Sequence, residues 1–348
     1  LVLLAEVLIF YRKILFSGAY AIPWDLRTFH LPLATFIAVA FRAGEFPLWD
    51  PFTYCGRPFY ANVQAQVFYP PTLIAVLASN LAGPDTLFYA LECQLVLHVL
   101  AAGVFTYWLL RRLNLSKWAA LTGASIYQLG GFFASQAQHL VVVNAAAWLP
   151  LAWLAVIELR ERFSWRWITV LAIAFAMSVL AGFPAVTVVV AASSVLLALL
   201  VSGVRLAGTV LAAGAWAALL SAVQLLPAIE LHGMSIAKYR VEWMKTGGGL
   251  PVASLASLIA PNYYGIFDLK TFKAPWDPTY LYVYCSIGGL ALALGALVRC
   301  RTRESVVFGV VTILFGVWML GDSTPLGLGF FLAMPKAIQN GLHPEFSM

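Results

Sequence analysis

Residues 85–110 read DTLFYALECQLVLHVLAAGVFTYWLL and are followed at once by Arg111 and Arg112. An apolar run of this length can cross the ~30 Å hydrocarbon core of a bilayer as one helix. Comparable runs recur along the chain, so we predict about nine membrane spans in an all-α polytopic membrane protein. They lie near residues 1–11, 85–110, 118–135, 143–158, 165–181, 184–201, 206–226, 281–298 and 305–320.

The composition excludes an ordinary soluble domain. Of the 348 residues, 62% are hydrophobic and 10% are charged, whereas a soluble domain carries about 25% charged residues. The net charge of +6 comes from basic residues in short connectors between apolar runs, so we expect no nucleic-acid partner. The four cysteines lack metal-ligand spacing, and we favour free thiols over a Cys55–Cys285 disulfide.

Basic residues decide the predicted orientation. Four basic connectors alternate along the chain as they would if all of them faced the cytoplasm; they are 111–117, 160–166, Arg205 and 299–303. Residues 68–82 contain Pro70 and Pro71 and are short for a span, so we predict an interfacial or re-entrant helix there. The segments expected outside are 12–84, 227–280 and 321–348. We expect residues 1–348 to form a single transmembrane domain that is truncated at both ends.

Most polar residues of the predicted spans gather toward their outer ends. Hydrogen bonds between helices would explain any one of them. Their common direction instead predicts a polar cavity that opens outward, because helix-joining amides have no reason to favour one leaflet. The residues are Glu92, Gln94, His98, Gln128, Gln136, Gln138, His139, Gln224 and Glu230.

The first outer segment is the richest in candidate chemistry. Asp25 is followed by Arg27 and His30, so its carboxylate is either a general base at the rim of a cavity or a surface partner of Arg27. Residues 31–42 form a short amphipathic stretch suited to the membrane surface. Further along, aromatic and proline residues surround Asp50, Arg57, Asn62 and Gln64, a pattern that suits either the membrane interface or a sugar site.

The second outer segment contains Lys238 and Arg240. They are candidates for holding a phosphate, since an Arg offers planar two-point geometry and a Lys a point charge. The alternative is a solvated loop with scattered charges.

Short motifs in a fixed order resemble the YfhO-type bacterial membrane proteins. They are Asp25-Leu-Arg with Pro32, Pro47-Leu-Trp-Asp-Pro-Phe52, Gly56-Arg-Pro58, Val67-Phe-Tyr-Pro70, Leu109-Leu-Arg-Arg-Leu113, Asn144-Ala-Ala-Ala-Trp-Leu-Pro150, Leu180-Ala-Gly-Phe-Pro184, Gln224-Leu-Leu-Pro-Ala-Ile-Glu230, Pro261-Asn-Tyr-Tyr-Gly265 and Gly321-Asp-Ser-Thr-Pro325. That family is similar to the GT-C glycosyltransferases, which take a sugar from a polyprenyl-phosphate carrier on the outer face of the membrane.

The resemblance implies a GT-C-like bundle in which Asp25 is the catalytic carboxylate. Many GT-C enzymes carry two acids at this place, whereas here the sequence is Asp25-Leu26-Arg27; no cofactor is therefore assigned, and a divalent metal is left open. The expected partners are a lipid-linked sugar donor, an envelope glycopolymer or lipid acceptor, and the bilayer. Substrate-binding candidates are Arg27, His30, Asp50, Arg57, Asn62, Gln64, Glu92, His139, Glu230, Lys238 and Arg240.

The resemblance thus implies a multi-pass cell-membrane glycosyltransferase, and the charge pattern places its expected active site on the extracytoplasmic side. Two alternatives stay open at this point. A transporter or flippase of lipid-linked precursors would need essential charges at mid-bilayer, and a non-enzymatic membrane scaffold would tolerate the loss of Asp25.

Overall fold

The computed structural model describes residues 1–235, 249–266, 270–274, 281, 283–299 and 302–333. A two-residue antiparallel pair, β1 (Trp49–Asp50) with β2 (Arg57–Pro58), is the sheet in these ranges. The helices there are α1 (Val2–Phe10), α2 (Arg12–Phe16), α3 (Leu31–Arg42), α4 (Pro70–Ala82), α5 (Leu87–Arg112), α6 (Lys117–Gln128), α7 (Gly131–Ser135), α8 (Leu140–Ala146), α9 (Leu149–Glu161), α10 (Trp165–Leu180), α11 (Pro184–Ser202), α12 (Val204–Leu220), α13 (Ala222–Met234), α15 (Ile287–Arg299), α16 (Arg303–Leu320) and α17 (Pro325–Leu332).

The all-α polytopic membrane fold is confirmed, but nine spans are not. In the described ranges, four helical stretches are long and apolar enough to cross a membrane, namely Pro84–Arg112, Leu140–Glu161, Pro184–Ser202 and Arg303–Leu320. A fifth is formed if α12 and α13 count as one span, although they meet at an angle of 80°.

The other predicted spans are shorter or interrupted. Residues 118–135 divide into α6 and α7, because the backbone is extended at Gly130 and the N–H of Gly131 donates to the carbonyl of Tyr284 at 2.9 Å. Residues 206–226 were expected to form one straight helix, and the structure bends them at Ser221. The length of an apolar run predicts which residues prefer lipid, but it does not predict whether they form one straight helix.

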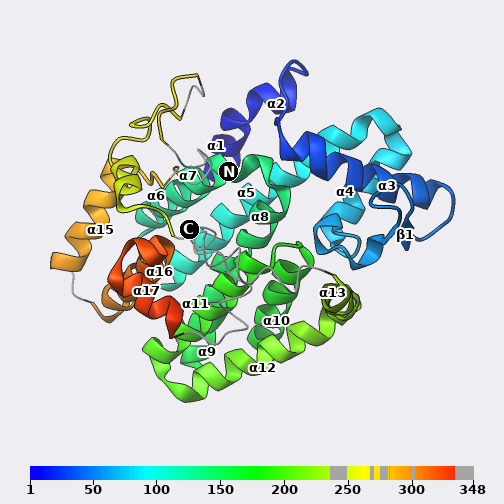
Figure 1. The fold of residues 1–348 in the computed structure, drawn as a ribbon. Helices are drawn as coiled ribbons and strands as arrows, with labels where there is room; N and C mark the ends of the chain where they lie inside the picture. Colours follow the sequence, from blue (N-terminus) through cyan, green and yellow to red (C-terminus); the bar gives the residue numbers. More distant parts are fainter. Residues whose placement is uncertain (236–248, 267–269, 275–280, 282, 300–301, 334–348) are drawn as a thin grey trace.

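A central bundle is formed by α5, α9, α10, α11 and α12 (Figure 1). Small side chains lie where these helices meet: Ala102, Ala152, Ala155, Ala172 and Ala198 are all fully buried. Because an alanine side chain is only a methyl group, neighbouring helix backbones can approach closely. Close packing of this kind holds helices together in lipid, where burial of apolar surface gives little driving force.

Ion pairs tie together one end of the bundle. The guanidinium of Arg112, at the end of α5, lies 2.7 Å from the Glu158 carboxylate near the end of α9. Arg160 reaches Glu304, at the start of α16, at 3.3 Å. Three connectors that we predicted to be cytoplasmic therefore meet at the same end, as the alternation of basic residues requires.

Residues 12–84, which we predicted to lie outside, pack at the opposite end. Figure 1 shows α3, α4 and β1 grouped beside the bundle. Helix α3 covers the predicted amphipathic stretch 31–42, with Leu33, Ile37 and Ala38 buried on one face. Helix α4 is a short helix that begins at Pro70 and lies against α5, consistent with the prediction that residues 68–82 do not span the membrane.

Between β2 and α4, the chain enters the bundle rather than crossing its surface. Phe59 and Tyr69 are buried, and the Gln66 amide donates to the carbonyl of Ala181 at 2.7 Å. Gly182 has a φ of +87°, and a Cβ added there would lie 2.2 Å from the carbonyl oxygen of Val63. Glycine at the end of α10 is therefore what lets this loop approach so closely.

Candidate functional site

Asp25 opens a helical turn, Leu26–His30, that runs directly into α3. Trp24, just before it, has a φ of +57°, which is unusual for a residue with a side chain and sets the direction in which the turn begins. Its carbonyl accepts hydrogen bonds from the N–H groups of Arg27 and Thr28, each at 2.8 Å. Leu26 and His30 point inward and are buried, while the Asp25 side chain keeps 51% of its surface exposed.

His139 meets Asp25 from a distant part of the sequence. Its Nε2 lies 3.4 Å from Oδ2 of Asp25, and its Nδ1 lies 2.7 Å from Oε1 of Gln136. If Nδ1 donates to that oxygen, Nε2 must also carry a hydrogen to face a carboxylate, and the ring is an imidazolium. If the Gln136 amide is turned round, its NH₂ donates to Nδ1 and the neutral ring again presents Nε2–H to Asp25. Either arrangement places a donor against the Asp25 carboxylate.

His30 lies beneath this pair as a neutral base. Burial, together with the nearby charge of His139, lowers the pKa of His30 to about 3. A neutral His30 does not compete with His139 for the negative charge of Asp25. The alternative partner suggested by the sequence was Arg27, but Arg27 is exposed and makes no ion pair with Asp25 in the described structure.

Glu92 fixes the chain just ahead of Asp25. This residue of α5 is 3% exposed, and its Oε1 accepts a hydrogen bond from the backbone N–H of Ile22 at 2.8 Å. From the sequence we expected Glu92 to line a cavity, but its carboxylate instead binds the backbone of Ile22. No feature of the sequence predicts this contact, since the two positions are 70 residues apart.

Asp50 and Arg57 face each other across the small β-hairpin. Nε of Arg57 lies 3.2 Å from Oδ2 of Asp50, and the N–H of Phe52 donates to Oδ1 at 2.9 Å. Burial alone would raise the pKa of Asp50, but hydrogen bonds from Thr53, Phe52 and Arg57 outweigh it, so the pKa is lowered. These two charges close the turn 50–57, whatever further role they have.

The remaining predicted site residues are more scattered. The Asn62 oxygen accepts from the N–H of Gln64 at 3.1 Å, a local turn contact. Glu230 is exposed on α13, and Lys238 and Arg240 fall outside the described residues. The structure thus brings Asp25, His30 and His139 together; binding roles for the other candidates stay predictions. Among the described residues, no group of three or more His, Cys, Asp or Glu side chains is arranged to hold a metal ion, and Cys55 and Cys285 are free.

The polar side chains of α5 do not line an open polar cavity. The Gln94 amide donates to Thr72 at 2.8 Å, and Thr72 donates to Oε1 of Gln66 at 2.7 Å. His98 contacts the Tyr69 hydroxyl, to which Trp148 also donates at 3.1 Å. Gln94 and His98, two of the nine residues from which we predicted an outward-opening cavity, thus belong to a buried network that joins the entering loop to α5 and Trp148.

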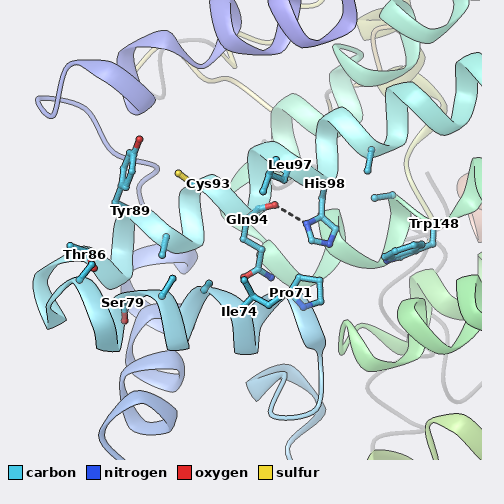
Figure 2. Close-up of a pocket in the computed structure, with 16 residues that line it drawn as sticks. Pro71, Ile74, Ser79, Thr86, Tyr89, Cys93, Gln94, Leu97, His98 and Trp148 are labelled. Atoms are coloured by element: carbon cyan, nitrogen blue, oxygen red, sulfur yellow. Dashed lines mark hydrogen bonds between the residues drawn. The ribbon is translucent and has the colours of Figure 1, made fainter. Parts of the chain in front are cut away.

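Next to this network, an apolar groove of about 700 Å³ runs between α4 and α5. Figure 2 shows Pro71 and Ile74 of α4 on one side, and Cys93, Leu97 and His98 of α5 on the other, with Trp148 at one end. Tyr89 lies toward the opposite end, and its hydroxyl donates to the carbonyl of Leu15 at 3.1 Å. The groove thus follows the N-terminal half of α5, which belongs to a stretch long and apolar enough to span a membrane.

The family described as Bacterial membrane protein YfhO matches residues 71–326. The chain belongs to the YfhO family. The YfhO match includes Glu92, Gln136 and His139 and begins after Asp25 and His30. No curated protein and no solved structure matches the chain.

Proposed function

We propose that this YfhO-family chain is a membrane glycosyltransferase that moves a sugar from a polyprenyl-phosphate carrier to an acceptor hydroxyl on the outer face of the cytoplasmic membrane. The observation that carries the proposal is the contact between Asp25 and His139. A half-exposed carboxylate held by a hydrogen-bond donor, beside a buried neutral histidine, is a group placed to take a proton from a substrate.

In the proposed reaction, Asp25 removes the proton from the acceptor hydroxyl as its oxygen attacks the anomeric carbon of the sugar. The new carbon–oxygen bond forms as the bond from that carbon to the phosphate oxygen breaks, and the configuration inverts. The polyprenyl phosphate leaves with the electron pair, and the proton stays on Asp25 until water accepts it. Phosphate is a good leaving group, so the site needs charge stabilisation more than an acid.

A donor with a long hydrocarbon tail suits the groove between α4 and α5. Nearly all of the surface that lines this groove is apolar, and it opens beside a span, where a chain can enter from the bilayer. We place the first isoprene units of the carrier there. Tyr89 lines the groove, and its hydroxyl binds the carbonyl of Leu15 in the segment that leads to Asp25. This contact supports the proposal that the lipid tail and the reacting sugar bind to neighbouring parts of the fold.

Lys238, Arg240 and Arg57 are the proposed phosphate ligands. Arg57 uses Nε for Asp50, which leaves its terminal nitrogens for a phosphate. An Arg57→Lys change keeps the charge but loses the planar fork and should restore only part of the donor affinity lost in Arg57→Ala.

The direct test is reconstitution. The purified protein in liposomes would be given a polyprenyl-phosphate hexose with a labelled sugar, together with membrane-derived acceptors. A transferase releases polyprenyl phosphate and forms labelled product. A flippase would change the leaflet of the intact donor without releasing phosphate, and a scaffold would do neither, so either of those results would contradict the proposal.

The outer location can be tested with a native thiol. Cys55 is exposed and lies in the first outer segment. In intact cells it should react with a membrane-impermeant maleimide, whereas a Lys117→Cys variant lacking the other cysteines should react only after the membrane is opened. The reverse pattern would put the Asp25 site on the cytoplasmic side.

A further inference from the structure

The segment that carries Asp25 is held at two buried points. The side chain of Ile22 is 4% exposed, and that of Leu26 is fully buried. Asp25 lies between these points, after Pro23, which has no N–H, and after Trp24 in its left-handed conformation. The direction in which Asp25 points therefore depends on where the backbone of Ile22 is fixed.

Glu92 fixes that backbone from inside the membrane domain. Its hydrogen bond to the N–H of Ile22 is 2.8 Å long and links the segment that carries Asp25 to the second turn of α5. A buried carboxyl group inside a span is costly and needs a reason to be there. A contact with a backbone N–H three residues before Asp25 provides one.

We propose that Glu92 is a positioning residue, which holds Asp25 against His139 through the backbone of Ile22 and does not itself touch the substrates. The inference rests on the proposed transfer reaction for its kinetic test, but its structural content is independent of that reaction. It replaces the role of substrate ligand that the sequence suggested for Glu92.

The two roles predict different responses to an isosteric change. A Gln at position 92 keeps a side-chain oxygen that can accept the Ile22 hydrogen bond, and it removes the negative charge. Glu92→Gln should therefore retain most of the transfer rate. Glu92→Leu and Glu92→Met cannot accept the bond, and each should lower kcat by roughly 10- to 100-fold, the scale expected when a reacting group moves by about 1 Å. KM for the donor should stay within about twofold.

A second readout needs no activity. In a background without native cysteines, an Asp25→Cys/His139→Cys pair would be joined by a short bifunctional thiosulfonate. The yield should be high with Glu92 or Glu92→Gln and should fall several-fold with Glu92→Leu or Glu92→Met. Gel filtration would select the folded fraction of each variant, so that loss of protein does not count as loss of position.

Several results would overturn the inference. Equal loss of rate in Glu92→Gln and Glu92→Leu would show that the charge matters. A raised donor KM with unchanged kcat would make Glu92 a substrate ligand. An unchanged cross-linking yield in the folded Leu and Met variants would show that Glu92 does not position Asp25. If neither the wild type nor any variant transfers sugar, but the cross-linking yields follow the predicted order, the positioning role stands and the transferase proposal fails.

Discussion

The Oδ2 atom of Asp25 lies 3.4 Å from Nε2 of His139. The two residues are far apart in the sequence, since Asp25 lies in the turn before α3 and His139 immediately precedes α8. The Gln136 amide orients the imidazole from its other side at 2.7 Å. Two turns from distant parts of the sequence, each ordered by its own local bonds, therefore converge on one carboxylate. In the proposed reaction, His139 is therefore the partner of the base, and its removal should have a measurable effect on the rate.

Removal of His139 should impair the same step as removal of Asp25. His139→Leu deletes the donor that faces the carboxylate. Because His139 acts on the proton transfer only through Asp25, kcat should fall by about 10-fold, less than the ~10²–10⁴-fold typical of a group that transfers the proton itself. In Asp25→Asn, the partner carboxylate is already lost, so adding His139→Leu should cost much less than it does alone. The measurement is kcat for the two single variants and the double variant. His232→Leu, on the exposed surface of α13, is the control. Fully multiplicative losses would contradict a joint role.

His30 should make stability depend on pH. Its folded pKa is about 3, because burial disfavours the charged ring, whereas an unfolded His has a pKa of about 6.5. Between these values the unfolded state binds a proton that the folded state does not. Stability should therefore be full above about pH 6.5 and fall by up to about 1.4 kcal/mol per pH unit as the pH decreases toward 3.

This can be measured as the change of Tm with pH for the protein in detergent. His30→Leu should flatten the slope between pH 6.5 and 4 relative to the wild type, while His232→Leu should leave it intact. Equal slopes in the wild type and His30→Leu would mean that other groups carry the acid sensitivity.

Gly182 should be intolerant of any side chain. Its positive φ and the 2.2 Å approach of the Val63 carbonyl leave no room for a Cβ. Gly182→Ala should cost about 2 kcal/mol or more and lower Tm, because strained backbone and a backbone clash add together. Gly214, inside α12, has nothing within 4 Å of its Cβ position, so Gly214→Ala should be neutral or raise Tm slightly. A stable Gly182→Ala protein would show that the loop 59–69 does not insert as described.

The fold was predictable where length and composition are sufficient. The span 85–110 became α5, the surface helix 31–42 became α3, and the short helix after Pro70 stayed short. The break at Gly130 and the bend at Ser221 were missed, because both lie inside apolar runs with no charge to mark them. A run of hydrophobic residues predicts a helix. It cannot show that a backbone N–H in that run will donate to a distant part of the chain, as Gly131 does to Tyr284.

The site was predictable only as a set of residues. Asp25, His30 and His139 were each candidates, from their positions beside the spans and from the family resemblance. Their mutual contact was not predictable, since nothing in the sequence couples residue 25 to residue 139. Glu92 and Gln94 suggested a cavity wall, whereas one holds the backbone of Ile22 and the other joins a buried network. In lipid, a polar group must find a partner, and only the tertiary structure shows which one.

The central claim is that Asp25 is the catalytic base, and one substitution tests it most directly. Asp25→Asn keeps the shape of the side chain and can still accept a hydrogen bond from His139, but it cannot take the acceptor proton. Transfer of labelled sugar from the polyprenyl-phosphate donor should fall by roughly 10²-fold or more, with normal insertion and Tm. Asp85→Asn, at an exposed carboxylate before α5, should retain the wild-type rate. Near-normal transfer by a well-folded Asp25→Asn protein would contradict the account of the site and leave the membrane fold untouched.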